Sequence, residues 1–245
     1  MRGLVLPVLL FALWQVIGMS GVVQSDAMSY PSEIARAGVS AVVDGSILKA
    51  TQQTVTTALV GLLIGGGLGI VLGSWFGLSR RAGRLAQTSV EVLRPIPSVA
   101  LIPLAMLTFG YGYGMGISVV AFACLWPTLI ITQSAVSQVP RELLEVADGL
   151  ELNWLQRLTY IIMPKIVPSL FTAIRLAAGV ALIVAVTAEI TANPIGLGYA
   201  LVVAQETLHP DRMFAYLIWV GLLGWLLNAG LVTMQRRLFV RWDNA

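Results

Sequence analysis

Long apolar runs alternate with short polar segments along the whole chain. The apolar runs cover residues 3–23, 54–78, 95–111, 115–136, 169–192 and 213–235. A helix needs about 20 apolar residues to cross a hydrocarbon core about 30 Å thick. The pattern therefore predicts an all-α membrane protein with six transmembrane helices. We divide it into residues 1–53, which hold the first helix and an outer interfacial segment, and a core domain of residues 54–245.

Two of the six runs differ from a simple span. The third contains Pro95, Pro97 and Pro103, so we expect a broken or kinked helix there. A break leaves backbone groups that must be satisfied by protein or by a water-lined cavity, as in a transport path. The first run is either an uncleaved span or a signal peptide with Arg2 as its basic start. Its length and the poor cleavage site at residues 22–25 favour an uncleaved span.

Two further segments have distinctive local patterns. Residues 24–50 lie outside the first two spans, and their Tyr30-Pro31 sequence predicts the start of a short interfacial helix. The second span carries glycine at every fourth position, namely Gly61, Gly65, Gly69, Gly73 and Gly77. This spacing removes side chains from one helix face, which lets another backbone approach closely. We interpret this glycine face as helix packing, with a sliding or pore-lining surface as the alternative.

The composition excludes several classes of protein. Hydrophobic residues make up 57% of the chain and charged residues 11%, with a mean hydropathy of +0.84, whereas a soluble domain has about 25% charged residues. The net charge of +3 is spread over several loops, which argues against a nucleic-acid partner. The single cysteine, Cys124, and the single histidine, His209, exclude an intramolecular disulfide and a cysteine-based or HExxH-type metal site.

The positions of lysine and arginine predict the orientation of the spans. With a cytoplasmic N-terminus, the inner segments hold twelve of the fifteen basic residues, and only Arg36, Lys49 and Arg212 remain outside. Cytoplasmic loops of membrane proteins are enriched in lysine and arginine. We therefore expect both termini on the cytoplasmic side.

The most informative segment is the inner loop at residues 140–168. It opens with Pro140, which suits the first turn of a helix. The apolar positions that follow at helical spacing are Leu143, Leu144, Ala147 and Leu150, while acidic residues cover the opposite side. A second apolar-patterned piece ends near Pro164. We expect a compact helical elbow, suited to a subunit driven by a cytoplasmic motor, with an ordinary interfacial loop as the alternative.

The elbow contains a recognisable spacing of glutamate, alanine, isoleucine and proline. The residues are Glu145, Ala147, Ile161 and Pro164. They resemble the EAA loop of bacterial ABC-importer permeases, whose pattern is E-A-A, three residues, Gly, nine residues and I-x-L-P. Val146 and Met163 replace the first alanine and the leucine, and Glu151 stands where that family has glycine. The segments Leu93–Leu104, Ala188-Glu189 and Gly196–Tyr199 also look like signatures of the taurine, alkanesulfonate and nitrate permease subfamily.

The resemblance implies a type I ABC-importer permease fold and a membrane subunit of an ATP-driven importer in the bacterial inner membrane. Such permeases work in pairs within the lipid bilayer. Each contacts one of two cytoplasmic ATPase subunits through the coupling helix of this loop, and a periplasmic binding protein delivers a small, often anionic solute. The coupling residues implied here are Leu143, Leu144, Glu145, Ala147, Leu150, Glu151, Ile161 and Pro164. The candidates for the gate or the path are Arg94, Pro95, Pro97 and Glu189.

We expect no catalytic site, metal or other cofactor in this chain. A phosphate-binding loop needs Gly-Lys-Ser or Gly-Lys-Thr. The only lysines, Lys49 and Lys165, follow Leu48 and Pro164 instead. ATP and Mg²⁺ would then be bound by the partner ATPase.

A secondary transporter is the alternative function, with Glu189 as an intramembrane ion or proton site. Glu189 lies 14 residues beyond Arg175, about 21 Å along a helix. If Arg175 marks the inner boundary, the carboxylate lies near the outer end. No inverted repeat is visible either, although secondary transporters often have one. A membrane enzyme is less supported, because the spans hold almost no carboxylates and no histidine. The transported solute is left open.

Glu151 bears on how the subunits pair. Glycine at this position of the family loop permits a left-handed turn, which glutamate adopts at a cost of about 1 kcal/mol. Gly149 could supply the turn instead, which would move the elbow. One altered loop is tolerable if the partner's loop is intact. Pairing with a second, different permease subunit is therefore a hypothesis beside the simpler homodimer.

Overall fold

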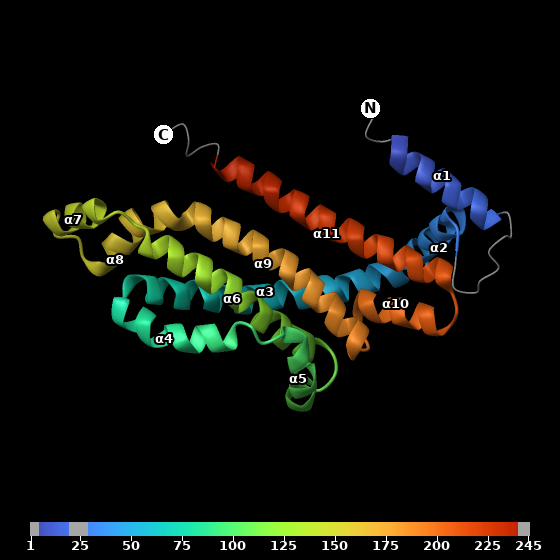
Figure 1. Cartoon of the computed structure of the whole chain (residues 1–245), viewed down its shortest axis with the longest axis horizontal. Helices are drawn as coiled ribbons and strands as arrows, with labels where there is room; N and C mark the ends of the chain where they lie inside the picture. The colour runs from blue at the N-terminus through green and yellow to red at the C-terminus, as the bar shows by residue number, and fades with distance from the viewer. Residues whose placement is uncertain (1–4, 20–28, 240–245) are drawn as a thin grey trace.

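The structure, a computed structural model, describes residues 5–19 and 29–239, which form helices joined by short connections (Figure 1). The helices are α1 (Val5–Met19), α2 (Pro31–Val43), α3 (Ser46–Leu78), α4 (Arg80–Leu93), α5 (Ile102–Phe109), α6 (Tyr113–Ser137), α7 (Arg141–Gly149), α8 (Trp154–Arg157), α9 (Met163–Thr191), α10 (Gly196–Glu206) and α11 (Pro210–Phe239). A 3-10 turn, η2 (Ser98–Leu101), precedes α5, and a π turn, η3 (Leu158–Ile162), precedes α9. The predicted all-α class is confirmed.

Within the described residues, four helical segments are long and apolar enough to cross a bilayer. They are α3, α6, the segment that contains α9, and α11. The pair formed by α4 and η2–α5 adds a fifth if it is one bent span. The run predicted at residues 3–23 corresponds to α1, whose 15 residues are fewer than a span needs. Both ends of that run lie outside the described residues.

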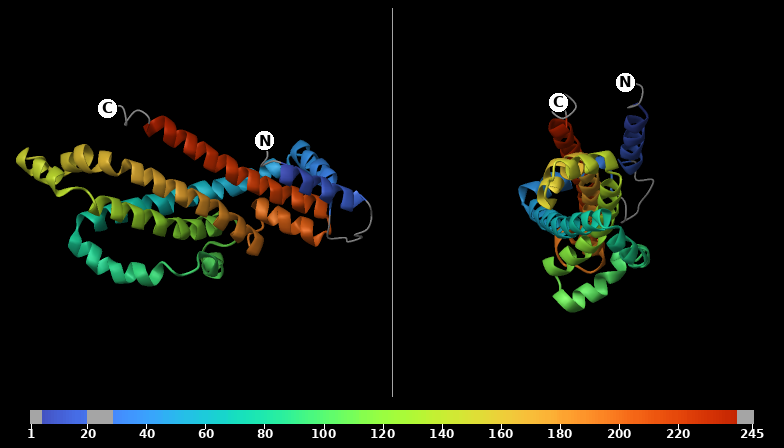
Figure 2. Two further views of the ribbon diagram at one scale, coloured as in Figure 1. Left: turned by 45° about the horizontal axis from the view of Figure 1, so that its top comes forward. Right: turned by 90° about the vertical axis from the view of Figure 1, so that its left-hand side faces the viewer.

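The two ends of the bundle carry different elements. Helices α3, α6 and α9 run along the long axis, and α11 contacts α9 (Figures 1 and 2). The elbow with α7 and α8 projects at one end, whereas α2 and α10 lie at the other (Figure 1). The buried core lies between α3, α6 and α9, and includes Ala58, Met115, Val119, Val120, Cys124, Ala177, Ala181, Ala185 and Ala188.

The glycine face of α3 lies directly against α6. A Cβ atom on Gly61 would come 2.5 Å from Val120, and one on Gly65 would overlap the backbone of Ala121. A Cβ atom on any of the remaining glycines of this face would likewise come too close to atoms of α6. Without side chains on this face, the two backbones reach contact over several turns. The interpretation as helix packing is confirmed.

The third apolar run forms a broken helix, as its prolines predicted. Helix α4 ends at Leu93, residues 94–97 form a bend, and η2 with α5 continues at 83° to α4. The structure differs from the prediction in placing a helix before the bend, where the sequence indicated an inner loop. Ser79 caps this helix, since its hydroxyl accepts a hydrogen bond from the Ala82 N–H (3.3 Å). Because α4 is polar, the hydropathy pattern did not indicate it.

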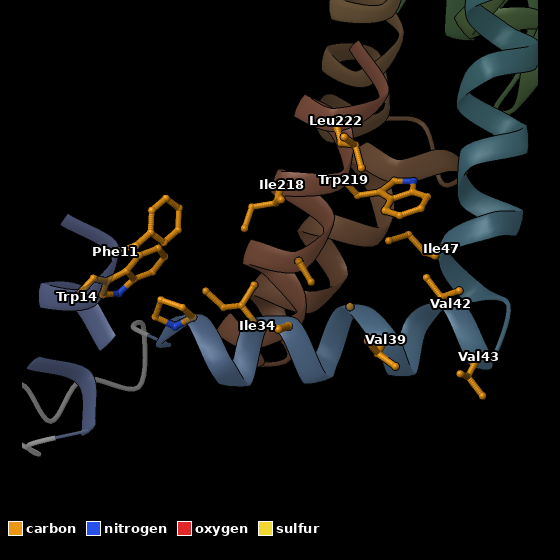
Figure 3. A pocket seen from close by; sticks show the side chains of 14 residues that line it. Phe11, Trp14, Ile34, Val39, Val42, Val43, Ile47, Ile218, Trp219 and Leu222 are labelled. Carbon is orange, nitrogen blue, oxygen red and sulfur yellow. The ribbon is translucent and has the colours of Figure 1, made fainter. Parts of the chain in front are cut away.

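Helix α2 lies across the ends of α3 and α11 (Figure 3). It begins as predicted, with Tyr30 before it and Pro31 in its first turn. A groove of about 440 Å³ opens between α1, α2 and α11. Figure 3 shows Trp14 of α1 and Ile218 of α11 on its sides. Its lining is almost entirely apolar, which matches lipid hydrocarbon and not a polar solute, so the groove is not the candidate path.

Candidate functional site

The elbow turns sharply at Glu151. The Leu152 N–H donates to the Ala147 carbonyl (3.0 Å), and Glu151 has a φ of +52°. This is the Schellman arrangement that ends many helices, with glutamate in the left-handed position usually held by glycine. Gly149 does not have a positive φ. The left-handed turn is therefore kept at Glu151 and has not moved to Gly149.

Replacing Glu151 with glycine is expected to stabilise the chain by about 0.5–1 kcal/mol, because glycine adopts positive φ without the steric penalty of a Cβ atom. Thermal unfolding of the purified chain in detergent, followed by circular dichroism, would show a higher midpoint. The matched control is Gly149→Ala, whose added Cβ meets nothing within 4 Å, and which should not lower the midpoint. A lower midpoint for Glu151→Gly would contradict the strain argument.

The second half of the elbow is held by a reciprocal cap. The Asn153 N–H donates to Gln156 Oε1, and the Gln156 N–H donates to Asn153 Oδ1, both at 2.9 Å. This capping box satisfies two backbone donors at the start of α8. The π turn and α9 then pack against the end of α6 and the connection after it, through Ile162, Ile166, Val136 and Val139. The elbow thus has a defined helical structure, as the sequence predicted.

The proposed coupling residues differ in their solvent exposure. Ala147 is fully buried within the chain (0% exposed). Glu145 and Glu151 are exposed, whereas Ile161 and Pro164 are half-buried near the start of α9. The side chain of Leu144 lies outside the described part of the structure. Ala147 thus packs inside the elbow, and its small side chain lets α7 approach the following segment.

One face of α7, together with Leu150, which directly follows the helix, exposes apolar side chains. Leu143, Val146 and Leu150 are 39%, 55% and 65% exposed, and their i, i+3, i+7 spacing puts them on one helix face. We call these three residues the α7 ridge. Val146 was missed by the sequence analysis, which treated it only as a departure from the family motif. Its spacing from Leu143 was the available signal.

A buried polar junction joins α3, α9 and α10 in the half of the bundle away from the elbow. Glu189, 1% exposed, accepts hydrogen bonds at Oε2 from Thr54 Oγ1 (2.8 Å) and from the Gly198 N–H (3.0 Å). The Thr54 hydroxyl oxygen in turn accepts one from the Leu197 N–H (2.9 Å). The carboxylate therefore lies at the N-terminus of α10, where backbone N–H groups stabilise negative charge.

Glycine is required where α10 meets this carboxyl group. Gly196 has a φ of +91°, and a Cβ atom there would overlap the Glu189 carboxyl group. A Cβ atom on Gly198 would lie 2.7 Å from the Glu189 Cβ and would overlap the Val186 carbonyl oxygen. The two signatures noted in the sequence, Ala188-Glu189 and Gly196–Tyr199, thus form a single packing unit.

Asn193 extends the junction to the loop before α6. Its Oδ1 accepts a hydrogen bond from the Gly112 N–H (2.8 Å), and its Nδ2 donates to the Gly112 carbonyl (3.0 Å). Asn193 is 1% exposed. Nothing in the sequence pattern indicated this contact, which joins residues 81 positions apart. The junction holds α3, the connection between α9 and α10, and the loop before α6 together in a buried arrangement, in which Glu189 Oε1 has no hydrogen-bond partner among the described residues. The gate role of Glu189 stays a prediction.

Three cavities follow one another along α6 beside the broken span. Their volumes are about 680, 410 and 210 Å³. The first two share Arg94 and Ile130, and the second and third share Phe122. Pro95 lines the first cavity, and Pro97 lies exposed in the same bend. The gate-or-path candidates therefore fall into two groups, with Arg94, Pro95 and Pro97 at these cavities and Glu189 in the polar junction.

The structure also offers no group of three or more histidine, cysteine, aspartate or glutamate residues that could hold a metal ion among the residues it describes.

The chain is similar to known transport proteins in both sequence and fold. Residues 65–243 match the family described as binding-protein-dependent transport system inner membrane component. The chain is 31% identical over 245 residues to a putative aliphatic sulfonates transport permease protein of Bacillus subtilis (strain 168), covering 100% of this chain and 88% of that protein. It is 30% identical over 170 residues to a nitrate import permease protein of Leptolyngbya laminosa, covering 69% and 61%.

The fold matches a chain of the MetNI methionine ABC transporter in an inward-facing conformation. The TM-score is 0.67 at 16% sequence identity, and the match covers 78% of this chain and 95% of that chain. At this identity the likeness concerns the fold alone, and it agrees with the expected type I permease architecture.

Proposed function

The chain belongs to the family of binding-protein-dependent transport system inner membrane components, and from that premise we propose that it couples solute movement to a separate cytoplasmic ATPase through the elbow. The observation that carries the proposal is the α7 ridge. Leu143, Val146 and Leu150 expose apolar surface at the end of the bundle, on a helix whose far end is fixed by the Glu151 turn. A helix with one exposed apolar face is suited to insertion into a groove of a partner protein.

Replacing Val146 or Leu150 with aspartate is expected to release the ATPase from the complex. Each change puts a charge into the apolar contact, and burying an unpaired charge is strongly unfavourable. Co-purification of the ATPase with a tagged permease should fall at least about tenfold, and ATP hydrolysis by the recovered complex should fall with it.

The matched control is Val43→Asp at the opposite end of the molecule. Val43 is 82% exposed on α2, so the same chemical change there should leave ATPase binding as in the wild type. Wild-type ATPase retention by both the Val146 and the Leu150 variants would contradict the coupling proposal. Failure of the wild-type chain itself to retain an ATPase would favour the secondary transporter.

The proposed solute is a small anion delivered by a periplasmic binding protein. The two relatives named above are described as permeases for aliphatic sulfonates and for nitrate, and both kinds of solute are anionic. Arg94 supplies a positive charge beside two of the three cavities along α6. ATP and Mg²⁺ belong to the partner ATPase in this scheme, and the chain itself performs no catalysis.

The proposed orientation places the elbow in the cytoplasm of a bacterial cell and both termini on that side of the inner membrane. Arg36, Lys49 and Arg212 belong to α2 and to the starts of α3 and α11, away from the elbow, whereas most other basic residues lie towards the elbow end. This distribution supports the orientation, because cytoplasmic ends are enriched in basic residues.

We propose a pair of identical chains as the permease assembly, with one ATPase subunit at each elbow. The alternative, pairing with a different permease subunit, was based on the departure of this loop from the family motif at Glu151. Because Glu151 keeps the left-handed turn, the elbow retains the geometry that glycine would give, and the motive for a different partner is weakened. The mass of the complex purified for the coupling experiment distinguishes two copies from one.

A further inference from the structure

The middle cavity along α6 lies against the bend of the broken span. Its volume of about 410 Å³ falls in the range of pockets that hold small organic molecules. Pro127 interrupts the hydrogen bonding of α6 at this cavity, and the backbone at residues 94–97 is not helical. Interrupted backbone at membrane depth is tolerated where it lines a solvent-filled space.

The cavity lies partway along the bundle and opens on its side, where the lining residues Arg94 and Leu176 are exposed. Helix α4 has 14 residues, which corresponds to about 21 Å, so its C-terminal end at Arg94 is far from the turn that begins it. The cavity nearer that turn shares Arg94 and adds the polar residues Gln87, Glu91 and Gln133. The cavity on the other side is lined mainly by apolar residues. Arg94 therefore lies between a more polar cavity and a less polar one.

The polar side chains that line the middle cavity, those of Arg94, Ser98 and Trp126, can all donate hydrogen bonds. Trp126 lines it and is 9% exposed, and its Nε1–H is buried with no acceptor among the described residues. An indole N–H can only donate. The Arg94 guanidinium, which also can only donate, lines the same cavity, as does Ser98. No aspartate or glutamate lines this cavity, and Glu91 lines the adjacent one beside Arg94. An anionic acceptor would complete the donor set of the middle cavity.

The rest of the wall is apolar. Phe122 packs edge-on against Trp126, with ring centroids 5.4 Å apart at 79°, and aliphatic side chains such as Ile130 and Val180 complete the lining. A bare inorganic anion would leave this surface in contact with water. A molecule with an anionic head and a short apolar body would cover it, while its head reaches the donors.

We propose that this cavity is a binding subsite for a small organic anion, in which Arg94, Ser98 and Trp126 bind the anionic head and the Phe122 side of the cavity holds the apolar body. The proposal rests on the proposed function, since it places the subsite on the translocation path. It goes further by naming the residues and by requiring an apolar portion in the preferred solute.

The test measures binding of radiolabelled 1-pentanesulfonate to the purified permease–ATPase complex in the absence of a binding protein. Saturable binding is expected in the wild type. Unlabelled pentanoate should compete, whereas sulfate should compete at least about tenfold less well, because it has no apolar body. Pentylammonium should not compete, because its charge is opposite.

Two variants test the assigned donors. Arg94→Gln should weaken binding at least about tenfold through loss of a charge-assisted hydrogen bond. Trp126→Phe keeps an aromatic ring but removes the N–H, and should weaken binding about threefold to tenfold. The controls are Arg84→Gln on the same helix and Trp75→Phe, an exposed tryptophan of α3, neither of which lines this cavity. Both controls should bind as the wild type does.

Several results would overturn the subsite. They are no saturable binding to the wild type, equal competition by sulfate, or unchanged affinity in both Arg94→Gln and Trp126→Phe. ATPase retention on each variant reports that the complex is assembled. In the proposed function, ATPase retention depends on the α7 ridge and not on this cavity. A complex that retains the ATPase but does not bind the anion therefore contradicts the subsite alone, whereas a complex that loses the ATPase contradicts the proposed function.

Discussion

Replacing Gly65 with alanine is expected to separate α3 from α6 and to lower the stability of the chain by at least about 3 kcal/mol. The added Cβ atom would overlap the backbone of Ala121. A backbone cannot move aside as a flexible side chain can, so the two helices must shift apart along their shared face. Thermal unfolding in detergent, followed by circular dichroism, should show a much lower midpoint, with a smaller yield of monodisperse protein.

Gly67 provides a matched control on the same helix. It is exposed, and a Cβ atom there meets nothing within 4 Å. Gly67→Ala should therefore leave the midpoint unchanged or raise it slightly, since alanine is favoured over glycine in a helix by about 0.5–1 kcal/mol. If Gly65→Ala and Gly67→Ala unfold at the same temperature, α3 does not pack on α6 as described.

Replacing Glu189 with alanine is expected to destabilise the polar junction by about 3 kcal/mol. The Thr54 hydroxyl and the Gly198 N–H would lose their shared acceptor in a site that is almost inaccessible to water. The deletion would also leave a void beneath the N-terminus of α10. The unfolding midpoint should fall, and limited proteolysis should cleave the connection between α9 and α10 faster.

Glu189→Gln separates hydrogen bonding from charge. Its amide oxygen can accept the same two hydrogen bonds, so this variant should lose much less stability than Glu189→Ala. If Glu189 belongs to the outer gate, Glu189→Gln should change the ratio of basal to solute-stimulated ATP hydrolysis without changing which solute is imported. Glu206→Ala, an exposed glutamate at the end of α10, is the control. Wild-type stability of Glu189→Ala would contradict the structural role of the junction.

Some features could be predicted because they depend on neighbouring positions in the chain. The apolar runs at 54–78, 115–136, 169–192 and 213–235 became parts of α3, α6, α9 and α11, since hydropathy over about 20 residues determines whether a helix can cross a bilayer. The start of α2 at Pro31 and the helical elbow followed from local capping and periodicity. The glycine spacing similarly predicted a close-packed face.

Other features required contacts between distant segments. The sequence singled out Glu189 and Gly196–Tyr199 separately, but only the fold places Thr54 of α3 against them, 135 positions from Glu189. The burial of Ala147 and the exposure of Val146 depended on how α7 turns back at Glu151. A helical period defines faces but does not say which face meets the rest of the chain.

The sequence by itself determined that this is an all-helical membrane protein with a broken third span and a helical elbow, because bilayer thickness, proline geometry and local periodicity act over short stretches of chain. Only the tertiary structure decided that α4 precedes the bend, that Arg94 and Trp126 share a cavity, and that the Glu189 carboxyl group lies beneath α10. Those arrangements depend on the relative positions of packed helices, which no local pattern specifies.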